Sequence, residues 1–177
     1  MQRVTSPLIA RLDAGDRAIF VRVALGTRPG ASSQRAWTLL THLGGATATV
    51  GVSLAAIAMG HGAWVDGGRA ALLTLVVSHL LVQLVKRSVG RPRPAEQFST
   101  AALIAAPDRF SFPSGHAAAV ASVAIGLGLA FPDWIPLLGA IAVLVGFSRV
   151  ALGVHYPGDV VVGQLLAVVS AWLLRSM

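Results

Sequence analysis

The chain has 177 residues and a formal net charge of +7; 55% of its residues are hydrophobic, only 12% are charged, and cysteine is absent. Because soluble domains average roughly 25% charged residues, this composition excludes an ordinary soluble domain and indicates an integral membrane protein, while the lack of cysteine excludes disulfides and thiolate chemistry. The cations lie in the N-terminal segment and at the ends of apolar runs, which favours contacts with anionic lipid headgroups over nucleic-acid binding.

The first 35 residues form a basic segment with six arginines. Leu8, Leu12, Ile19 and Val23 recur at near-helical spacing, with charged residues elsewhere on the helical wheel. We therefore expect residues 1–35 to contain an amphipathic helix that lies at the membrane interface. A poorly ordered basic tail is the alternative.

Residues 36–177 are expected to form a single membrane-embedded, all-α domain. Spanning about 30 Å of hydrocarbon takes roughly 20 helical residues, and charges that flank a shorter run can reach the headgroups. Five apolar runs meet this requirement and predict a bundle of five spanning helices: 36–60, 70–85, 116–132, 134–148 and 160–174.

The unusual polar residues gather at one membrane face of this predicted bundle. Successive helices alternate in direction, so the end of the second, the start of the third, the end of the fourth and the start of the fifth meet at the same face. The segments at these positions are KRSVGRPRP (86–94), PSGH (113–116) and SRVALGVHYPGD (148–159). The links at the opposite face contain no comparable cluster, so we place the function at the first face.

Three cations at this face predict an anion site. Arg149 lies near the end of an otherwise uncharged run, where an arginine without a partner costs about 2.5–3.5 kcal/mol by insertion scales. Lys86 and Arg93 flank a Gly-Arg-Pro break that ends the second helix. Arginine forks and a lysine point charge suit a multiply charged anion such as phosphate. The alternative for Arg149 is that it reaches the headgroups without a partner.

The PSGH segment predicts a second kind of anion binder. Ser114 is a good N-cap, and Gly115 lets an anion approach the backbone closely. We expect the third helix to start here, so that its free N–H groups and the positive end of its dipole face the same phosphate.

His116, His155 and Asp159 supply the candidate chemistry. Asp159 follows His155 by four residues, and a carboxylate at one ring nitrogen fixes the tautomer and raises the nucleophilicity of the other nitrogen. We assign His155 as nucleophile, Asp159 as its orienting partner and His116 as general acid for the leaving oxygen. The alternative is a zinc or iron site built from these three side chains, which the neighbouring cations disfavour.

Three segments, in this order and with this internal spacing, resemble the signature of the type 2 phosphatidic acid phosphatase superfamily: Lys86-x6-Arg93-Pro94, Pro113-Ser114-Gly115-His116 and Ser148-Arg149-x5-His155-x3-Asp159. The resemblance implies a helical membrane enzyme that dephosphorylates lipid phosphates through a phosphohistidine intermediate, without a metal or other cofactor. It assigns the phosphate contacts to Lys86, Arg93, Ser114, Gly115 and Arg149, and it gives the two histidines and the aspartate the roles above. Arg91 begins a second Arg-Pro pair, but the six-residue gap after Lys86 selects Arg93.

The number of spanning helices determines the predicted side of the site. With five, the N-terminus and the catalytic face share a side, which then carries twelve of the 14 cations, and the positive-inside rule places the site in the cytoplasm. Many bacterial relatives in the family have six spanning helices, and the site faces outwards if residues 8–25 also cross. A cytoplasmic site favours a biosynthetic substrate such as phosphatidylglycerophosphate or a polyprenyl-phosphate sugar phosphate, whereas an outward site favours recycling of undecaprenyl diphosphate; phosphatidic acid is a further candidate.

Two other functions fit the same residues. The phosphoryl group on His155 could pass to a lipid or sugar acceptor instead of water, which would make the protein a phosphotransferase. A non-catalytic lipid-binding membrane protein could keep the same fold, although the complete set of His116, His155 and Asp159 argues against it.

Overall fold

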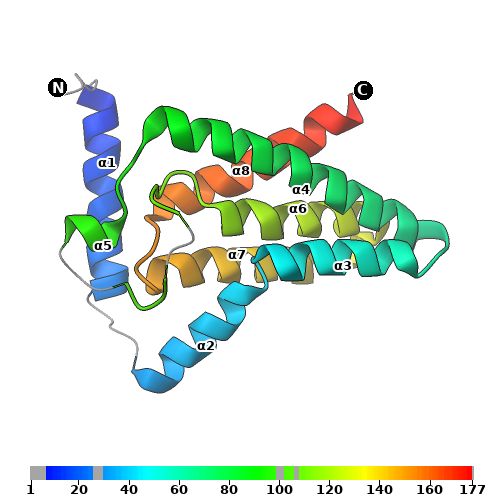
Figure 1. Cartoon of the computed structure of the whole chain (residues 1–177), viewed down its shortest axis with the longest axis horizontal. Coiled ribbons are helices and arrows are strands. Elements are labelled where there is room, and N and C mark those ends of the chain that lie inside the picture. The colour runs from blue at the N-terminus through cyan, green and yellow to red at the C-terminus, as the bar shows by residue number, and fades with distance from the viewer. Residues whose placement is uncertain (1–6, 26–29, 99–101, 106–107, 177) are drawn as a thin grey trace.

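The computed structural model describes residues 7–25, 30–98, 102–105 and 108–176, and the regular structure within these ranges is entirely helical. In chain order the elements are α1 (Pro7–Phe20) with a π-helical turn η1 (Val21–Leu25), α2 (Ala31–His42), α3 (Ala46–Ala58), α4 (Gly62–Val89), α5 (Pro94–Gln97), α6 (Gly115–Ala130), a 3-10 turn η2 (Pro132–Trp134), α7 (Ile135–Ala151) and α8 (Pro157–Arg175). Figure 1 shows α3, α4, α6, α7 and α8 forming an elongated bundle, with α1 lying crosswise at one end. The predicted all-α class is confirmed for the described residues.

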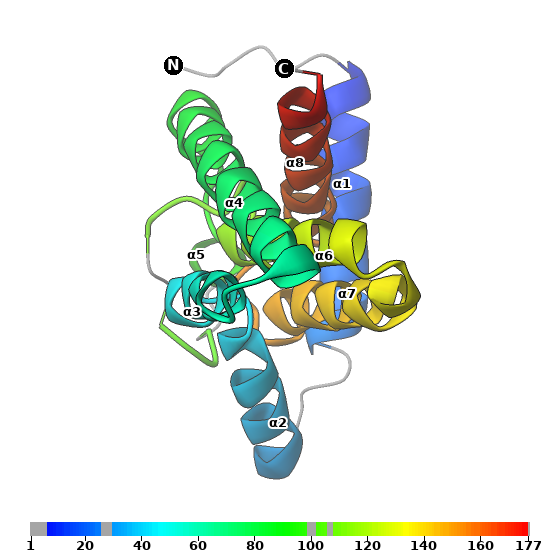
Figure 2. The ribbon, with the colours of Figure 1, turned by 90° about the vertical axis from the view of Figure 1, so that its right-hand side faces the viewer.

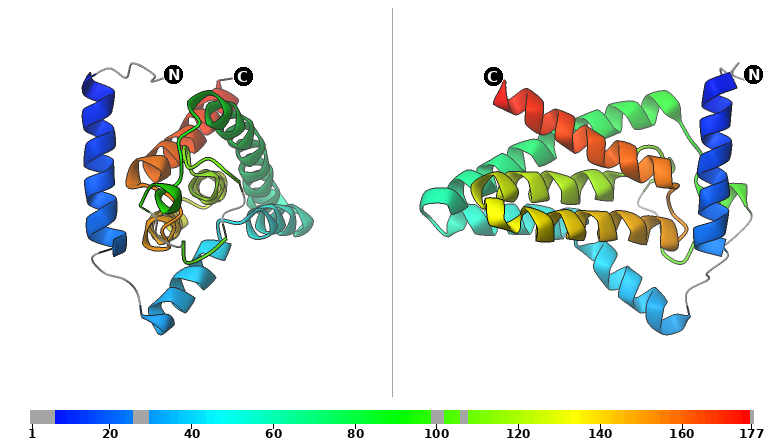
Figure 3. Two further views of the ribbon diagram at one scale, coloured as in Figure 1. Left: turned by 60° about the vertical axis from the view of Figure 1, so that its left-hand side comes forward. Right: turned by 180° about the vertical axis from the view of Figure 1, so that it is seen from behind.

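Helix α6 occupies the centre of the bundle, where it packs against α3, α4, α7 and α8 (Figure 3). A Cβ atom on Gly126 would lie 2.2 Å from the backbone nitrogen of Ala71, so only glycine permits this close crossing of α4 and α6. The hydroxyls of Ser78 and Ser122 join the same two helices by a hydrogen bond of 2.9 Å. Small side chains therefore let the helix backbones approach closely around α6.

Within the described ranges, three helical segments are long and apolar enough to cross a membrane: Gly62–Gln97, Pro132–Ala151 and Pro157–Arg175. Helix α6 is shorter, with 16 residues, and its central position shields it from lipid. The bent pair α2 and α3 provides a fourth span if the two helices cross together. Membrane-spanning character is thus confirmed, and the count of five spanning helices stays a prediction.

The apolar run 36–60, predicted as one helix, is divided into α2 and α3 with a bend of 47°. The break contains Gly44, where an added Cβ would lie 2.8 Å from Val145 and 2.9 Å from the carbonyl oxygen of His116. The chain turns here because the backbone of Gly44 packs directly onto α6 and α7, a tertiary contact that run length does not reveal.

An aromatic cluster lies at the end of the bundle opposite α1. The ring of Phe131 is 4.6 Å from that of Trp64 and 5.0 Å from that of Trp134, centroid to centroid. Tryptophan is enriched at both membrane–water interfaces, so the cluster is in keeping with a bundle whose long axis crosses the membrane.

The N-terminal segment forms the predicted helix as α1 and η1. Its buried face is formed by Phe20 and Ala24, whereas Ile19, which we expected on the apolar face, is 53% exposed. The side chains of Leu8 and Leu12 lie outside the described part of the chain. Figure 2 shows α1 steeply inclined to α6 and α7, as expected for a helix parallel to the membrane plane; its interfacial location stays a prediction.

Candidate active site

All eight residues of the predicted site lie at the end of the bundle next to α1, where α4, α6, α7 and α8 begin or end. Lys86 and Arg149 occupy the last turns of α4 and α7, and Arg93 directly precedes α5. Ser114 caps α6 ahead of Gly115 and His116. His155 and Asp159 lie at the junction of α7 and α8. The predicted convergence of helix ends at one face is therefore present in the structure.

Local sequence explains why these helices end where they do. Gly90 adopts a left-handed conformation (φ 61°) and ends α4, and its N–H donates to the carbonyl of Lys86. At the start of α8, Pro157 occupies the first turn and Asp159 completes a capping box with Tyr156. The polar side chains of the site are therefore fixed by ordinary helix-terminus chemistry.

His155 is fully buried, and its two ring nitrogens face different partners. A guanidinium nitrogen of Arg93, Nη1, lies 3.3 Å from His155 Nε2, and because arginine only donates, Nε2 is the accepting, unprotonated nitrogen. The proton of the neutral ring then lies on Nδ1, which is 3.5 Å from Asp159 Oδ2, longer than a hydrogen bond. Burial lowers the pKa of His155 to about 4, against the opposing effect of Asp159. At neutral pH the ring is uncharged and has a lone pair on Nε2.

The carboxylate of Asp159 is completely buried and held by several groups. Oδ2 accepts a hydrogen bond of 2.8 Å from the backbone N–H of Tyr156, and Oδ1 accepts one of 2.7 Å from Nη1 of Arg91. Asp159 is therefore ionised and fixed in place beside His155. The spacing from Lys86, which selects Arg93 over Arg91, does not predict this contact of Arg91.

Lys86 and Arg93, two of the predicted phosphate ligands, share one carboxylate that we did not predict. Asp108 Oδ2 lies 2.6 Å from Lys86 Nζ, and Oδ1 lies 2.7 Å from Arg93 Nη2. The two cations are almost completely buried, whereas the side chain of Asp108 is 38% exposed. Burial alone would raise the pKa of Asp108, but the hydrogen bonds and charges of Lys86 and Arg93 lower it overall. Asp108 thus pairs with two of the three cations that the sequence predicts to bind phosphate.

Arg149 is the third predicted cation and is 1% exposed. Its Nη1 donates to the hydroxyl of Thr41 at 2.8 Å, while its Nε and Nη2 have no hydrogen-bond partner among the described residues. Because unpaired buried donors are costly, the two unpaired nitrogens of Arg149 are suited to an anionic ligand.

The start of α6 has the predicted form. The hydroxyl of Ser114 accepts from the N–H of Ala117 at 3.5 Å, and the N–H of Ser114 donates to the carbonyl of Asp159 at 2.9 Å. A Cβ on Gly115 would meet nothing nearer than 4.0 Å, so helix packing does not require glycine here. A glycine at this position leaves the helix N-terminus open to a ligand.

His116 lies under the bend between α2 and α3. A Cβ on Gly45 would be 3.9 Å from His116 Nε2, and one on Gly44 would be 3.2 Å from His116 Cβ. The alternative metal site required His116, His155 and Asp159 to act as shared ligands, but the described residues contain no group of three His, Asp or Glu side chains placed to hold one ion.

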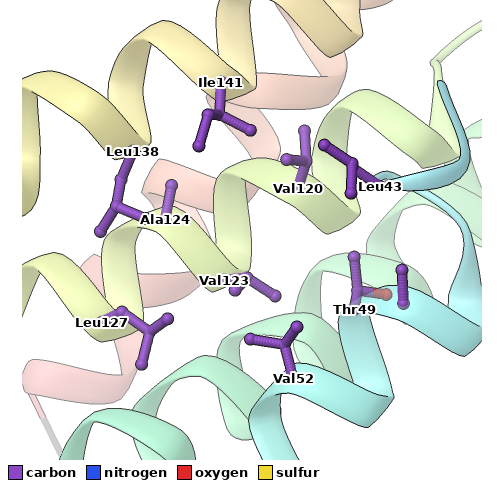
Figure 4. Close-up of a pocket in the computed structure, with 10 residues that line it drawn as sticks. Leu43, Thr49, Val52, Val120, Val123, Ala124, Leu127, Leu138 and Ile141 are labelled. Carbon is purple, nitrogen blue, oxygen red and sulfur yellow. The ribbon is translucent and has the colours of Figure 1, made fainter. Parts of the chain in front are cut away.

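An apolar cavity of about 180 Å³ extends from this region between α3, α6 and α7 (Figure 4). Leu43 and Val120 line it near the site, and Leu127, Leu138 and Ile141 line it deeper in the bundle. Leu43 adjoins the bend that covers His116, and Val120 is one helical turn beyond that histidine. The cavity therefore begins one helical turn from His116 and runs along α6 between apolar side chains.

Comparison with known proteins identifies a family and relatives that are named phosphatases. The model of the PAP2 superfamily matches residues 67–177. The chain is 39% identical over 104 residues to the undecaprenyl-diphosphatase of Sulfolobus acidocaldarius, a match covering 58% of this chain and 49% of that protein. It is 35% identical over 156 residues to the decaprenylphosphoryl-5-phosphoribose phosphatase of Mycolicibacterium smegmatis, covering 84% and 81%. The chain thus spans about half the length of the first relative and most of the second.

A solved structure has the same fold. The transmembrane PAP2-type phosphatidylglycerolphosphate phosphatase from Bacillus subtilis superposes with a TM-score of 0.75 at 28% identity, over 94% of this chain and 85% of that one. The family match covers more than half of the present chain and includes every residue of the predicted site. The chain therefore belongs to the PAP2 superfamily.

Proposed function

We propose that this protein is a lipid phosphate phosphatase in which His155 is the nucleophile. The observation that carries the proposal is the state of His155: a buried, neutral ring whose Nε2 lone pair faces Arg93. A nucleophile with an unprotonated nitrogen beside buried cations suits attack on an anionic phosphate ester. Family membership and the names of the relatives support the same reaction class.

The phosphate group binds among Lys86, Arg93 and Arg149, and the backbone N–H groups after Ser114 at the start of α6 complete the site. Arg149 contributes Nε and Nη2, which lack a hydrogen-bond partner among the described residues. The carboxylate of Asp108 leaves Lys86 and Arg93 as the phosphate oxygens arrive. These cations stabilise the charge that accumulates on the phosphoryl oxygens, so the proposed mechanism uses no metal ion.

Reaction then takes place in two steps. Nε2 of His155 attacks phosphorus, the bond to the lipid oxygen breaks, and His116 donates a proton to that oxygen; Asp159 stabilises the ring, which keeps its proton on Nδ1. In the second step a water molecule, deprotonated by His116, attacks the phosphohistidine and releases inorganic phosphate. Both histidines return to their starting protonation states.

The apolar cavity beside the site supports a lipid substrate. Its lining is almost entirely aliphatic, and the hydroxyl of its polar member Thr49 donates to the carbonyl of Gly45 at 2.9 Å. A hydrocarbon chain in this cavity would keep its phosphate at the level of His116. The names of the two relatives point to polyprenyl phosphates or diphosphates, and that of the Bacillus subtilis protein to phosphatidylglycerophosphate; we take these, with phosphatidic acid, as the substrate class.

We further propose that residues 36–177 act as one catalytic membrane domain and that α1 lies on its cytoplasmic surface. The crosswise orientation of α1 (Figure 1) supports the interfacial location, and the excess of cations on the face next to α1 supports the cytoplasmic side. Accessibility of an N-terminal tag in intact cells tests the side.

Activity of the purified protein tests the proposed function. The protein should release inorganic phosphate from a polyprenyl diphosphate or a phosphatidylglycerophosphate in the presence of EDTA, and His155→Gln should abolish turnover, whereas the control His61→Gln at the other end of the bundle should not. Loss of activity on chelation would contradict the metal-free mechanism. Product that forms only with a lipid or sugar acceptor would identify a phosphotransferase, and lipid binding without turnover would identify a non-catalytic protein.

The roles of the two histidines are separable by the choice of leaving group. His116→Gln should lose much more activity on a lipid phosphate than on an aryl phosphate whose leaving group needs no proton. Equal losses on the two substrates would contradict the general-acid role of His116.

A further inference from the structure

A charged network connects α1 to the catalytic end of α8, and its arginine and its two α1 carboxylates have no part in the phosphate chemistry described above. Its centre is Arg91, whose Nη1 donates to Asp159 Oδ1 and to Asp16 Oδ2, both at 2.7 Å, and whose Nη2 donates to Asp13 Oδ1 at 2.7 Å. The partners are 68 to 78 residues away from Arg91 in sequence. Arg91 therefore joins three separate parts of the chain.

Asp16 contacts the start of α8 in two ways. While its Oδ2 accepts from Arg91, its Oδ1 accepts from the backbone N–H of Gly158 at 2.7 Å. The side chain of Asp16 is 13% exposed and that of Arg91 is 15% exposed, so solvent screens these contacts only partly. Asp16 therefore fixes both the arginine that holds Asp159 and the backbone one residue before Asp159.

Apolar packing holds α1 in the same place. The Arg91 guanidinium lies 3.9 Å from the centre of the Tyr156 ring, and Phe20 of α1 packs against Tyr156 and Phe98 at centroid distances of 5.3 and 5.6 Å. Tyr156 directly follows His155. The turn that carries the nucleophile is thus bounded by α1 on one side and by Arg91 on another.

The charges require this arrangement. The Asp159 carboxylate has no solvent exposure, and a buried carboxylate needs ionic or hydrogen-bond partners to stay ionised. Among the described residues, Arg91 is the cation that contacts it directly, and the backbone N–H of Tyr156 donates to its other oxygen. Without Arg91, Oδ1 would lose its ionic partner, and only the Tyr156 N–H would hold the carboxylate beside the His155 ring.

We propose that Arg91 and Asp16 are positioning residues that hold Asp159, and through it His155, in the geometry for attack. The proposal rests on the proposed function, because it takes His155 as the nucleophile. It makes α1 a component of the catalytic apparatus as well as a membrane-surface helix.

A double-mutant cycle tests whether Arg91 acts through Asp159. Arg91→Gln should lower kcat about tenfold to hundredfold, the scale of a misplaced reacting group, with KM for the lipid phosphate changed less than about threefold. In an Asp159→Asn background the same substitution should lower kcat less than about twofold. An equal loss in both backgrounds would show that Arg91 acts independently of Asp159 and would overturn the proposal.

Control variants distinguish positioning from general loss of charge or folding. Arg87→Gln removes an exposed cation from the same end of α4 and should leave kcat within about twofold. Arg91→Lys keeps one donor and should restore part of kcat at equal protein yield and Tm. An Arg91→Gln protein whose kcat equals that of the parent would also overturn the positioning role of Arg91. If His155→Gln is inactive in the same assay, the nucleophile role of His155, and with it the proposed function, still holds.

The role of α1 is tested by comparing its two acidic residues. Asp16 shares Nη1 of Arg91 with Asp159, whereas Asp13 contacts only Nη2, so Asp16→Asn should lower kcat about three- to tenfold and Asp13→Asn less than twofold. Nitrogen-15 NMR of the labelled His155 ring should show Nδ1 protonated in the parent protein. In Arg91→Gln and Asp16→Asn the same ring should show a mixture of its two neutral tautomers. Unchanged kcat and unchanged tautomer in Asp16→Asn would contradict a role for α1.

Discussion

Replacing Asp108 with asparagine removes the carboxylate that pairs with Lys86 and Arg93 in the ligand-free site. If phosphate competes with this carboxylate, the variant should bind phosphate and vanadate more tightly than the parent protein. Asparagine is nearly the same size and keeps one oxygen that can accept from either cation, so the loop should stay close to its present position.

The size of the effect follows from the geometry. The two contacts are 2.6 and 2.7 Å long, and hydrogen bonds to charged groups contribute about 1.5–3 kcal/mol each when buried. Because the side chain of Asp108 is 38% exposed, solvent reduces this, and exposed pairs contribute only about 0.2–1 kcal/mol. We expect about 1–2 kcal/mol in total, which at about 1.4 kcal/mol per factor of ten is a 5- to 30-fold lower inhibition constant for vanadate or phosphate.

The assay is inhibition of lipid phosphate hydrolysis by vanadate, with Asp133→Asn, at the opposite end of the bundle, as the matched control. In the Asp108→Asn variant KM should fall with kcat nearly unchanged, since uniform binding is affected. Its Tm without ligand should also fall, because Lys86 and Arg93 lose their counter-ion, and vanadate should raise its Tm more than that of the parent. An inhibition constant that is unchanged or higher would refute competition and show instead that Asp108 holds the two cations in their binding geometry.

Three further predictions concern individual site residues. The pKa of His155 is about 4 in the folded protein, below the unfolded value of 6.5. The contribution of His155 to stability is therefore present above pH 6.5 and is lost as the pH falls towards 4. For the same reason, the decrease of kcat/KM at acid pH that His155 causes should lie near pH 4 instead of 6.5. Arg149→Lys should lower kcat/KM about 10- to 100-fold, measured by steady-state kinetics, because lysine cannot supply the coplanar donors of Nε and Nη2. Activity within threefold of the parent would contradict a direct phosphate contact. Gly44→Ala should lower the free energy of unfolding by about 1–3 kcal/mol in a denaturation assay. The control Gly51→Ala should not destabilise α3, because a Cβ there meets nothing within 4 Å. Equal stabilities of the two variants would show that the bend at Gly44 tolerates a side chain.

The positions of the site residues could be predicted because they depend on helix ends. The lengths of the apolar runs and helix-capping residues such as Ser114 limit where α6, α7 and α8 begin and end. Because successive helices alternate in direction, those ends meet at one face of the bundle. The charge and chemistry of His155 and Arg149 then indicate an anion site. None of these steps requires knowledge of how side chains pack.

The features that were not predicted all depend on tertiary contacts. Gly44 lies inside a long apolar run, and the break occurs there because its backbone meets α6 and α7. Asp108 lies in an irregular segment without periodicity, so nothing in the sequence indicates that it reaches Lys86 and Arg93. The repeated Arg-Pro pair did draw attention to Arg91, but spacing from Lys86 could not show that its partners come from α1 and α8.

The acidic partners also determine how a phosphate meets the site. Asp108 compensates Lys86 and Arg93 in the structure, whereas Arg149 has no ion pair with a described residue and keeps two unpaired guanidinium nitrogens, Nε and Nη2. Under the proposed function, an arriving phosphate dianion finds Arg149 available first, and it gains Lys86 and Arg93 only when the carboxylate of Asp108 moves away. Because that exchange replaces one negative charge with two, it favours a dianionic phosphomonoester over a phosphodiester, which carries a single charge and resembles the carboxylate that it must displace.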